Sequence, residues 1–238
     1  IVPFMDFELE IFSKKKNLFK KNNIQIVVSD FDFIANCLDK KKFHEFCNDN
    51  KISTPKIITN ISSKNIKYPI FVKERKGSGS INQYKIHSKN ELKIDDNKIL
   101  QEFIEGKEYG MDILNSYKGE YIHSFVRKKI LMKNGETDQA AGIYSNKFNK
   151  IAKYISKKTK HNGNLDIDFI ISKKDKKIYF LDFNPRFGGG YPITHLSGYN
   201  YLKYIIYSHI NPNYQFKIPK KINKILMSKG ISIYTKKL

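Results

Sequence analysis

Two patterns of apolar residues divide the chain near residue 54. In residues 8–21 and 39–50 the apolar positions recur at helical spacing, with polar residues between them. The β-branched run at 24–28 lies between these segments and predicts a short strand. Pro55 follows the second helical pattern and fixes the exit of the chain. Residues 1–54 are therefore predicted to form the last part of an open α/β unit.

From Pro55 onward the extended patterns follow one another closely, several of them across short turns such as 117–120. Strands are predicted at 57–58, 68–73, 83–86, 98–103, 111–117, 121–130, 166–171 and 178–183, and helices at 148–160 and 198–209. This mixture predicts an α+β domain with largely antiparallel sheets over residues 55–238.

The chain is strongly basic, with 44 Lys and Arg against 23 Asp and Glu, which gives a net charge of +21. A basic groove with interleaved aromatic residues would suit nucleic acid. Only three of the cations are arginines, namely Arg75, Arg127 and Arg186, whereas nucleic-acid readers usually rely on Arg for bidentate contacts. The composition therefore favours a solvated lysine surface and no nucleic-acid partner. A basic nucleic-acid-binding protein stays as the least favoured alternative.

The cysteine content is low, with Cys37 and Cys47 ten residues apart. On a helix these two side chains would point in different directions, so neither a disulfide framework nor a metal site is predicted from them. The sequence also contains no apolar run of membrane-spanning length and no recognisable signal peptide. These features predict a cytoplasmic protein with no membrane partner.

The first motif is an apolar strand that ends in Lys73 and is followed by Gly77, Ser78, Gly79 and Ser80. Glycine lets backbone N–H groups approach phosphate oxygens closely, and Lys73 would add a point charge to the same phosphates. The order differs from a Walker loop, because the lysine precedes the glycines. Taken alone, a β-hairpin with a glycine turn and a surface lysine explains the segment equally well.

The second motif, at 99–109, is a strand that runs into a polar bend containing Glu102, Ile104 and Glu108. Such a bend can offer backbone groups to the edge of an adenine and a carboxylate to a ribose hydroxyl. Taken alone, an ordinary strand end with exposed acids is the better interpretation of this segment.

The third motif is a pair of acids on two consecutive predicted strands, Asp168 on the first and Asp182 on the second. In a hairpin these acids would lie side by side, and Asn184 would share the face of Asp182 because side chains alternate along a strand. Two carboxylates and an amide oxygen form a hard oxygen site suited to Mg²⁺. Arg186 follows closely and is placed to neutralise a transferring phosphoryl group. A solvent-facing edge hairpin is the alternative.

Two weaker candidates for substrate binding remain. Arg127 and Lys129 alternate on a predicted strand and would share a face, where they are predicted to hold an anionic substrate. A solvated basic edge explains them equally well. His195 lies just beyond the glycine run 188–190 and is a candidate for an acceptor pocket, although a lone His is more often structural or surface-exposed.

The order of the three motifs resembles that of the ATP-grasp superfamily. Within it, the stretch at 187–198 is similar to the carbamoyl-phosphate-synthase-like, carboxylate–amine ligase group. The resemblance implies an α+β fold in which two subdomains of residues 55–238 grip ATP around a hinge near 101–108. It also implies that residues 1–54 are the end of an α/β pre-ATP-grasp domain, including the Leu38-Asp39-Lys40 signature. Because the chain starts at Ile1 without Met, we expect earlier strands of that domain to precede it.

The resemblance also implies a role for each motif residue. Lys40 and Lys73 correspond to the two phosphate-binding lysines, and Arg186 to the arginine near the γ-phosphate and the substrate, so Lys73 and Arg186 are the implied catalytic residues. The remaining correspondences are Gly77, Ser78, Gly79 and Ser80 to the loop over the phosphates, Gln101, Glu102, Phe103 and Ile104 to the adenine hinge, Glu108 to the ribose acid, and Asp168, Asp182 and Asn184 to the Mg²⁺ ligands.

Two departures from the family pattern are visible. Many relatives have Glu or Gln where this chain has Asp168 and Asp182, and the shorter side chains would shift the metal. Asn82-Gln83 stands where relatives often continue with glycine, which bears on the mobility of the loop over the phosphates.

The implied activity is that of an ATP- and Mg²⁺-dependent ligase, with Mn²⁺ as an alternative metal. A substrate carboxylate attacks the γ-phosphate to form an acylphosphate, and an amine or similar nucleophile then displaces phosphate. The partners are thus a small-molecule carboxylate and an amine, with a homodimer as the oligomeric state to be tested. Carboxyphosphate or carbamoyl-phosphate chemistry on bicarbonate is the rival activity. A catalytically silent nucleotide-binding scaffold is a further alternative, and the retained motif residues argue against it.

Overall fold

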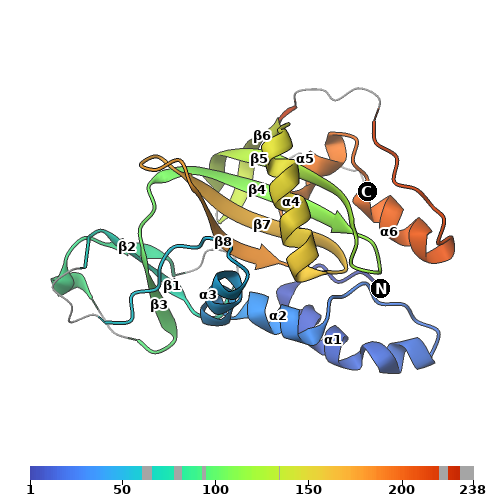
Figure 1. Cartoon of the computed structure of the whole chain (residues 1–238), viewed down its shortest axis with the longest axis horizontal. Coiled ribbons are helices and arrows are strands. Elements are labelled where there is room, and N and C mark those ends of the chain that lie inside the picture. The colour runs from blue at the N-terminus through green and yellow to red at the C-terminus, as the bar shows by residue number, and fades with distance from the viewer. Residues whose placement is uncertain (61–65, 78–81, 93–94, 134, 220–224, 231–238) are drawn as a thin grey trace, which may run out of the picture.

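The computed structural model describes residues 1–60, 66–77, 82–92, 95–133, 135–219 and 225–230. Within them the strands form two antiparallel sheets, one three-stranded in the order β2-β1-β3 and one six-stranded in the order β8-β7-β4-β5-β6-β9. Figure 1 shows the small sheet at one end of the molecule, beside β8 and α3. The α+β prediction is therefore confirmed.

The small sheet consists of β1 (Ile70–Glu74), β2 (Tyr84–Ile86) and β3 (Lys98–Glu102), with a short 3₁₀ turn at Lys89–Glu91. The large sheet consists of β4 (Gly106–Asn115), β5 (Tyr121–Lys133), β6 (Glu136–Ile143), β7 (Gly163–Ser172), β8 (Ile178–Asn184) and β9 (Leu226–Ser228). The helices are α1 (Asp6–Lys21), α2 (Phe31–Leu38), α3 (Lys40–Asp49), α4 (Asn146–Thr159), α5 (Tyr191–Leu196) and α6 (Tyr201–Ile210).

The N-terminal segment differs from the prediction in two elements, one of which is α2, a helix that the sequence analysis did not predict. The helices at 8–21 and 39–50 are confirmed as α1 and α3, but 24–28 is not a strand. Its link to another extended segment is two backbone hydrogen bonds, from Val27 N to Ile1 O and from the Ile1 amine to Gln25 O. A β-branched run forms a strand only when a neighbour supplies a ladder, and these two bonds are too few.

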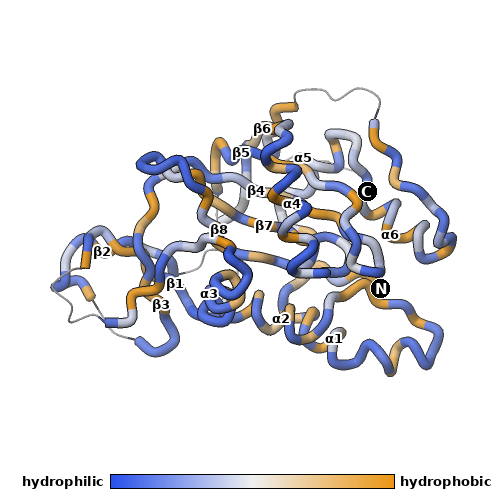
Figure 2. The backbone as a smooth tube through the Cα atoms, viewed as in Figure 1, coloured by the Kyte–Doolittle hydropathy of each residue, from blue (hydrophilic) through white to orange (hydrophobic). Residues whose placement is uncertain are grey.

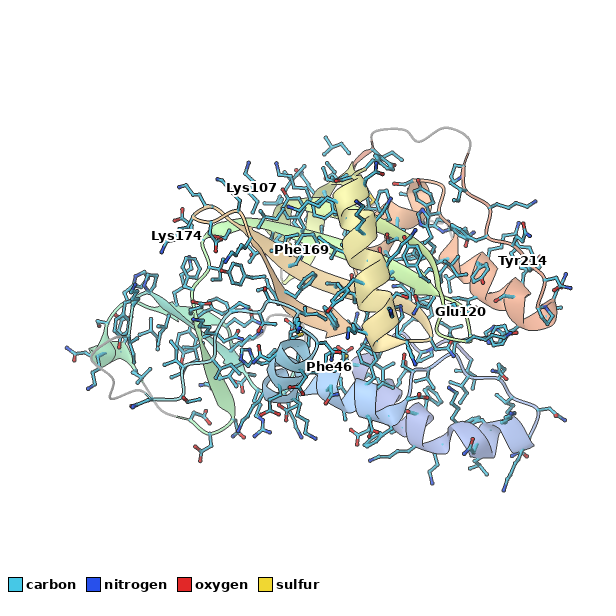
Figure 3. The ribbon with its side chains drawn as sticks, in the orientation of Figure 1. Phe46, Lys107, Glu120, Phe169, Lys174 and Tyr214 are labelled. Atoms are coloured by element: carbon cyan, nitrogen blue, oxygen red, sulfur yellow. The ribbon has the colours of Figure 1, made fainter. Side chains whose placement is uncertain are left out.

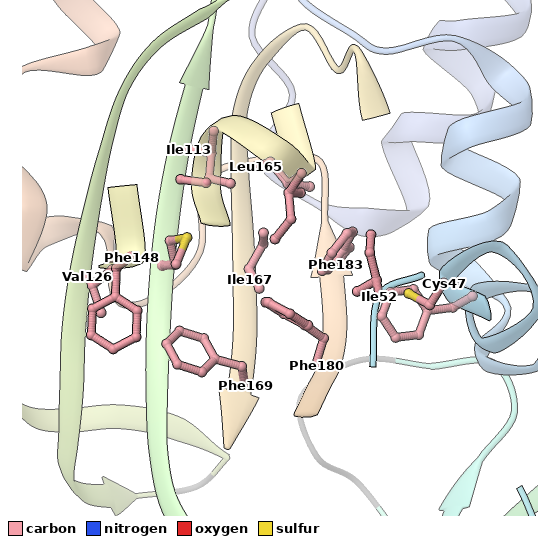
Figure 4. Packing of buried hydrophobic residues seen from close by; sticks show 14 of the residues in the cluster. Cys47, Ile52, Ile113, Val126, Phe148, Leu165, Ile167, Phe169, Phe180 and Phe183 are labelled. Atoms are coloured by element: carbon pink, nitrogen blue, oxygen red, sulfur yellow. The ribbon is translucent and has the colours of Figure 1, made fainter. Parts of the chain in front are cut away.

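One face of the large sheet holds the main hydrophobic core, because alternate side chains on a strand point to the same side. Leu165, Ile167 and Phe169 on β7 pack with Met111 and Ile113 on β4. Helix α4 covers this face, and Cys47 of α3 and Ile52 close it beside β8 (Figures 1 and 4). Figure 3 shows Phe169 within the fold beside α4, while Lys107 and Lys174 lie at the outer edge.

The opposite face of the large sheet changes character along its strands. Near α5 and α6 it is apolar, with Leu114 and Phe125 packed against Tyr199 and Tyr201. Farther along, the same faces of β4, β5, β7 and β8 carry charged residues, and this charged part positions the site described below. Figure 2 shows hydrophobic residues within the strands and a hydrophilic turn between β7 and β8. In the part of the chain that the structure describes, no helix is both long and apolar enough to cross a membrane.

Candidate active site

A cavity of about 1070 Å³ lies between the N-terminal helices, the segment after β1 and the charged face of the large sheet. Its walls come from α1 to α3, from residues that follow β1, from β5 to β8 and from the loop at 186–190. The sequence-predicted residues that line it are Lys40, Gly77, Arg127, Lys129, Asp168, Asp182, Asn184 and Arg186. Residues far apart in the sequence, including three predicted metal ligands, thus share one cavity.

The two predicted acids lie opposite each other in the β7–β8 ladder. Asp168 pairs with Asp182, and Asp166 pairs with Asn184 two residues along. A bulge follows at once, since Phe169 pairs with Phe180 and Leu181 is left as the extra residue. Bulges re-aim side chains next to functional sites. The predicted hairpin geometry is therefore present, although it does not by itself test metal binding.

The chemistry of this donor set suits a hard divalent cation. Asp168 and Asp182 each keep 31% of their side-chain surface exposed, and Asn184 adds an amide oxygen on the same face. Among the described residues no group of three or more His, Cys, Asp or Glu is arranged to hold a metal. Mg²⁺ in phosphoryl-transfer sites is commonly held by one or two carboxylates together with substrate phosphates, so these residues fit that ion.

Each acid has a lysine beside it. Lys129 Nζ lies 2.7 Å from Asp168 Oδ1, and Lys73 Nζ lies 3.8 Å from Asp182 Oδ1 and donates to Leu181 O at 3.1 Å. Burial lowers the pKa of Lys73, against the opposing effect of Asp182. Burial would also lower the pKa of Lys129, but the nearby acids, Asp168 foremost, together outweigh it and raise that pKa. The four charges balance in pairs, two acids against two lysines.

Lys40 ties the N-terminal segment to the residues that follow β1. Asp39 caps α3 by accepting hydrogen bonds from the backbone of Lys41 and Lys42, and its carboxylate also binds the Arg75 guanidinium at 3.0 Å. Lys40 is buried, and its Nζ donates to Gly77 O at 2.8 Å. The Asp39-Lys40 pair thereby anchors the start of the predicted phosphate loop, whose Ser78, Gly79 and Ser80 lie outside the described residues.

Arg127 is fully buried and forms ion pairs with Asp112 on β4 and Asp166 on β7. To reach Asp166 it passes over Gly110, where a Cβ would lie only 2.7 Å from Arg127 Nε. Burial raises the pKa of Asp166 to about 6, although the Arg127 charge opposes that rise. Because internal carboxylates bind both terminal nitrogens, the geometry favours Arg127 as a support for the acid-bearing strands. Its predicted contact with a substrate stays a prediction.

The glycine run rests directly on this buried ion pair. A Cβ at position 188 would lie 2.0 Å from Asp166 Oδ2, and one at position 190 would lie 2.2 Å from Arg127 Nε. Real Cβ atoms do not approach other atoms so closely. Gly188 and Gly190 are therefore required for the 186–190 loop to lie against β5 and β7, where it forms one wall of the cavity.

Arg186 faces the cavity but is already paired. Its Nε and Nη2 donate to the two carboxylate oxygens of Asp6 at 2.6 and 2.9 Å, and its Nη1 donates to Phe187 O at 3.1 Å. Arg186 therefore presents a two-pronged guanidinium to a carboxylate, which is the geometry in which arginine binds carboxylates and phosphates most strongly.

The predicted hinge residues do not line this cavity. Gln101 is buried and donates to Pro55 O at 3.5 Å, Glu102 accepts from Lys56 N, and the Phe103 ring lies 4.1 Å from Lys85 Nζ. Ile104 lies between β3 and β4, and Glu108 is an exposed residue of β4. Their nucleotide-binding roles stay predictions.

His195 is exposed on α5, with its ring 6.1 Å from that of Tyr191. It does not line the cavity either, so its predicted place in an acceptor pocket stays a prediction.

Three acids of the site were given no role in the sequence analysis, namely Asp6, Asp112 and Asp166. Asp112 is fully buried between Met111 and Ile113 on β4 and accepts hydrogen bonds from Arg127 and Thr194. An acid inside an apolar strand pattern is itself a signal, because burial of an unpaired carboxylate is costly. Asp6 offered no such signal, since an acid in the first turn of a helix is commonplace.

Comparisons with known proteins agree on the family. An ATP-grasp domain model matches residues 37–190. The chain is 24% identical over 216 residues to a carbamoyl-phosphate synthase from Methanobrevibacter smithii, an alignment that covers 79% of this chain and 57% of that protein.

Two solved structures illustrate the similarity of fold. The first is the biotin carboxylase domain of 2-oxoglutarate carboxylase from Hydrogenobacter thermophilus, crystallised as a dimer with MgADP, ADP and bicarbonate. It has a TM-score of 0.71 and 16% identity to this chain, over 88% of this chain and 53% of that one. An L-amino acid ligase from Bacillus licheniformis has a TM-score of 0.64 and 16% identity over 87% of this chain and 55% of that one. The present chain spans little more than half the length of these proteins. Since the family model matches more than half of its residues, the chain belongs to the ATP-grasp domain family.

Proposed function

We propose that this chain is an ATP-grasp ligase that uses Mg·ATP to activate a substrate carboxylate as an acylphosphate, which an amine or similar nucleophile then attacks. The observation that carries the proposal is the pairing of Asp168 with Asp182, each beside a lysine, in a cavity that Lys40 and Arg186 also line. Family membership and the similarity to an L-amino acid ligase support it.

In this proposal the two acid–lysine pairs separate when the nucleotide binds, and each charged group takes a new partner. Asp168, Asp182 and Asn184 would hold the metal, which releases Lys129 and Lys73 to neutralise phosphate oxygens. Lys40 is anchored to Gly77 and would hold the start of the glycine segment near the same phosphates. Bound Mg·ATP supplies the phosphoryl group and the charge that polarises it. Arg186 would orient the carboxylate and neutralise the charge that develops during transfer.

A thermal shift measurement with ADP, with and without Mg²⁺, tests the nucleotide site. A ligand that binds only the folded protein must raise its melting temperature. We expect a Mg²⁺-dependent rise for the wild type that Asp182→Ala abolishes. The matched control is Asp32→Ala, which removes an exposed acid from α2 away from the cavity and should retain the rise. A wild-type protein whose melting temperature does not respond to MgADP would contradict the proposal.

A second candidate is phosphoryl transfer to bicarbonate. The relative named carbamoyl-phosphate synthase and the carboxylase domain crystallised with bicarbonate favour it. ATP hydrolysis separates the two activities. Hydrolysis that depends on bicarbonate alone would support the second candidate, whereas hydrolysis that depends on an organic carboxylate would support the first.

We further propose that the enzyme uses Mn²⁺ as an alternative metal, functions in the cytoplasm and forms a homodimer. Cys37 and Cys47 are both free thiols, as expected in a reducing compartment. The dimeric carboxylase domain supports the proposed oligomeric state. Light scattering would measure the mass of the assembly, and a thermal shift with MnADP would test the second metal.

A further inference from the structure

The pairing of Arg186 with Asp6 leaves two opposite charges side by side on the cavity wall. The Arg186 side chain is 15% exposed and that of Asp6 is 17% exposed, so each group is largely removed from water. Both residues line the cavity. Arg186 follows Asn184 closely, and its backbone N–H donates to Asn184 O at 2.7 Å. A carboxylate bound to Arg186 would therefore lie beside the proposed metal ligands.

An apolar surface continues from this ion pair along the same cavity. It is formed by Phe4, Met5, Phe7 and Phe31. These side chains stay accessible, with exposed fractions of 46%, 53%, 70% and 37%. The Phe4 ring stacks on Phe187 at a centroid distance of 5.4 Å, which fixes this wall against the loop that carries Arg186. We call these four residues the apolar wall.

We propose, on the basis of the function proposed above, that the activated substrate is an α-amino acid with a large apolar side chain. Its carboxylate would bind Arg186, its ammonium group would bind Asp6, and its side chain would lie on the apolar wall. The zwitterion replaces the single Arg186–Asp6 pair with two pairs of opposite charge. Neither charge is left without a partner, and the net charge of the cavity wall is unchanged.

The same reasoning excludes simpler carboxylates as good substrates. A monocarboxylate that displaced Asp6 from Arg186 would leave the Asp6 carboxylate largely buried and unpaired, which is unfavourable. A simple amine would leave Arg186 unpaired in the same way. A site whose buried charged groups need a partner from the ligand discriminates strongly against ligands that lack the matching group.

The chemical step is balanced without further reactants. A carboxylate oxygen of the amino acid forms a bond to the γ-phosphorus, and the bond from that phosphorus to the β–γ bridging oxygen breaks, which releases ADP. The nitrogen of the amine acceptor then attacks the acyl carbon, inorganic phosphate leaves, and the nitrogen loses a proton to solvent.

Binding of three related ligands in the presence of MgADP tests this inference on the wild-type protein. They are phenylalanine, 3-phenylpropanoate, which lacks the amino group, and 2-phenylethylamine, which lacks the carboxylate. We expect calorimetry to give at least about tenfold tighter binding for one enantiomer of phenylalanine than for either analogue. Equal affinities for phenylalanine and 3-phenylpropanoate would overturn the proposal.

Variants then identify the groups responsible. Asp6→Asn should lower the affinity for phenylalanine to that for 3-phenylpropanoate, while Asp6→Glu should restore part of the difference. Asp49→Asn is the matched control, because Asp49 is an exposed acid on α3 that does not line the cavity. Phe7→Ala should weaken phenylalanine binding without weakening that of alanine. An unchanged preference for phenylalanine in Asp6→Asn would overturn the assignment of Asp6.

The response to MgADP in the same samples separates this inference from the proposed function. A melting temperature that rises with MgADP, combined with no preference for the amino acid, would overturn only the substrate class. A melting temperature that does not respond to MgADP would overturn the proposed function itself. Trapping the acylphosphate with hydroxylamine provides a second readout, because the hydroxamate should form from phenylalanine and not from 3-phenylpropanoate.

Discussion

Arg127 Nε lies 2.2 Å from the point that a Cβ would occupy at Gly190. Arg127 is on β5 and Gly190 ends the loop that follows β8. The buried Arg127 side chain therefore fills the space next to a backbone segment that is distant in the sequence. This contact links the ion pairs of Arg127 with Asp112 and Asp166 to the wall of the cavity. A substitution that adds a side chain at position 190 would force Arg127 or the loop to move.

Gly190→Ala should destabilise the fold by about 1–3 kcal/mol, because the added methyl group overlaps Arg127 and forces a shift of the loop. Urea denaturation would measure the loss. The matched control is Gly230→Ala, since a Cβ at Gly230 meets no atom of the described residues within 4 Å, and its stability should stay close to that of the wild type. Equal stabilities of the two variants would show that the loop adjusts without cost.

Arg127→Leu should be more damaging, by about 3–5 kcal/mol, because it leaves Asp112 and Asp166 buried without their cation. Lys128→Leu removes a neighbouring charge whose side chain points to the other face of β5 and provides the control. Thermal denaturation of both variants checks the prediction. A melting temperature of Arg127→Leu within about a degree of the control would contradict the structural role of the buried ion pairs.

Lys73→Met keeps the length of a nearly buried side chain but removes its charge. If Lys73 binds phosphate, affinity for ADP should fall by about 10- to 100-fold, the usual effect of losing a charge-assisted hydrogen bond. Lys107→Met, which removes an exposed lysine from β4 (Figure 3), is the control. Calorimetric titration of ADP would measure both affinities, and equal values would refute a phosphate-binding role for Lys73.

The burial of His161 predicts how the free energy of unfolding changes with pH. His161 is fully buried, its Nε2 donates to Ile113 O at 3.1 Å, and its Nδ1 lies 2.7 Å from Thr159 Oγ1. Burial lowers the pKa of His161 to about 4 from its ordinary 6.5. Between those pH values the unfolded chain binds a proton on His161 that the folded protein does not bind. The contribution of His161 to the free energy of unfolding is therefore complete above pH 6.5 and is lost as the pH falls, up to about 3 kcal/mol.

Urea midpoints of the wild type and of His161→Gln, at about pH 7 and about pH 5, would test this. The variant should lose less stability on acidification than the wild type. His123, whose pKa burial also lowers to about 4, is present in both proteins, as is Asp166, whose raised pKa acts in the opposite direction. The difference between the two proteins therefore isolates His161, and an identical pH dependence would contradict its assignment.

Local patterns predicted the parts of the site that one hairpin determines. The alternation of Asp182 and Asn184, and the opposition of Asp168 and Asp182, follow from strand geometry and a short turn, so both could be expected from the sequence. The pairing of Arg186 with Asp6 joins residues 180 positions apart, and no local pattern contains that information. Arg127 was expected to face a substrate because its partner on β4 was not recognised.

The errors in secondary structure have similar causes. The run at 24–28 has the composition of a strand but too few ladder partners, whereas β6 has polar and small residues and is a strand because β5 pairs along most of its length. Helix α5 is short and follows a glycine run, so its periodicity is too brief to recognise. The boundary near residue 54 is still a prediction.

The positions that form the apolar wall and the cap of α3 come from the first forty residues, whereas the acids of the β7–β8 hairpin come from residues 166–184. In the proposed function, the contacts to the ammonium group and the side chain of the substrate would therefore come from the N-terminal segment, whereas the metal ligands and Arg186 would come from the hairpin and the loop after it. Substitutions at Phe4, Met5, Phe7 or Phe31 would then alter the preferred side chain of the substrate while leaving Asp168, Asp182 and Asn184 unchanged.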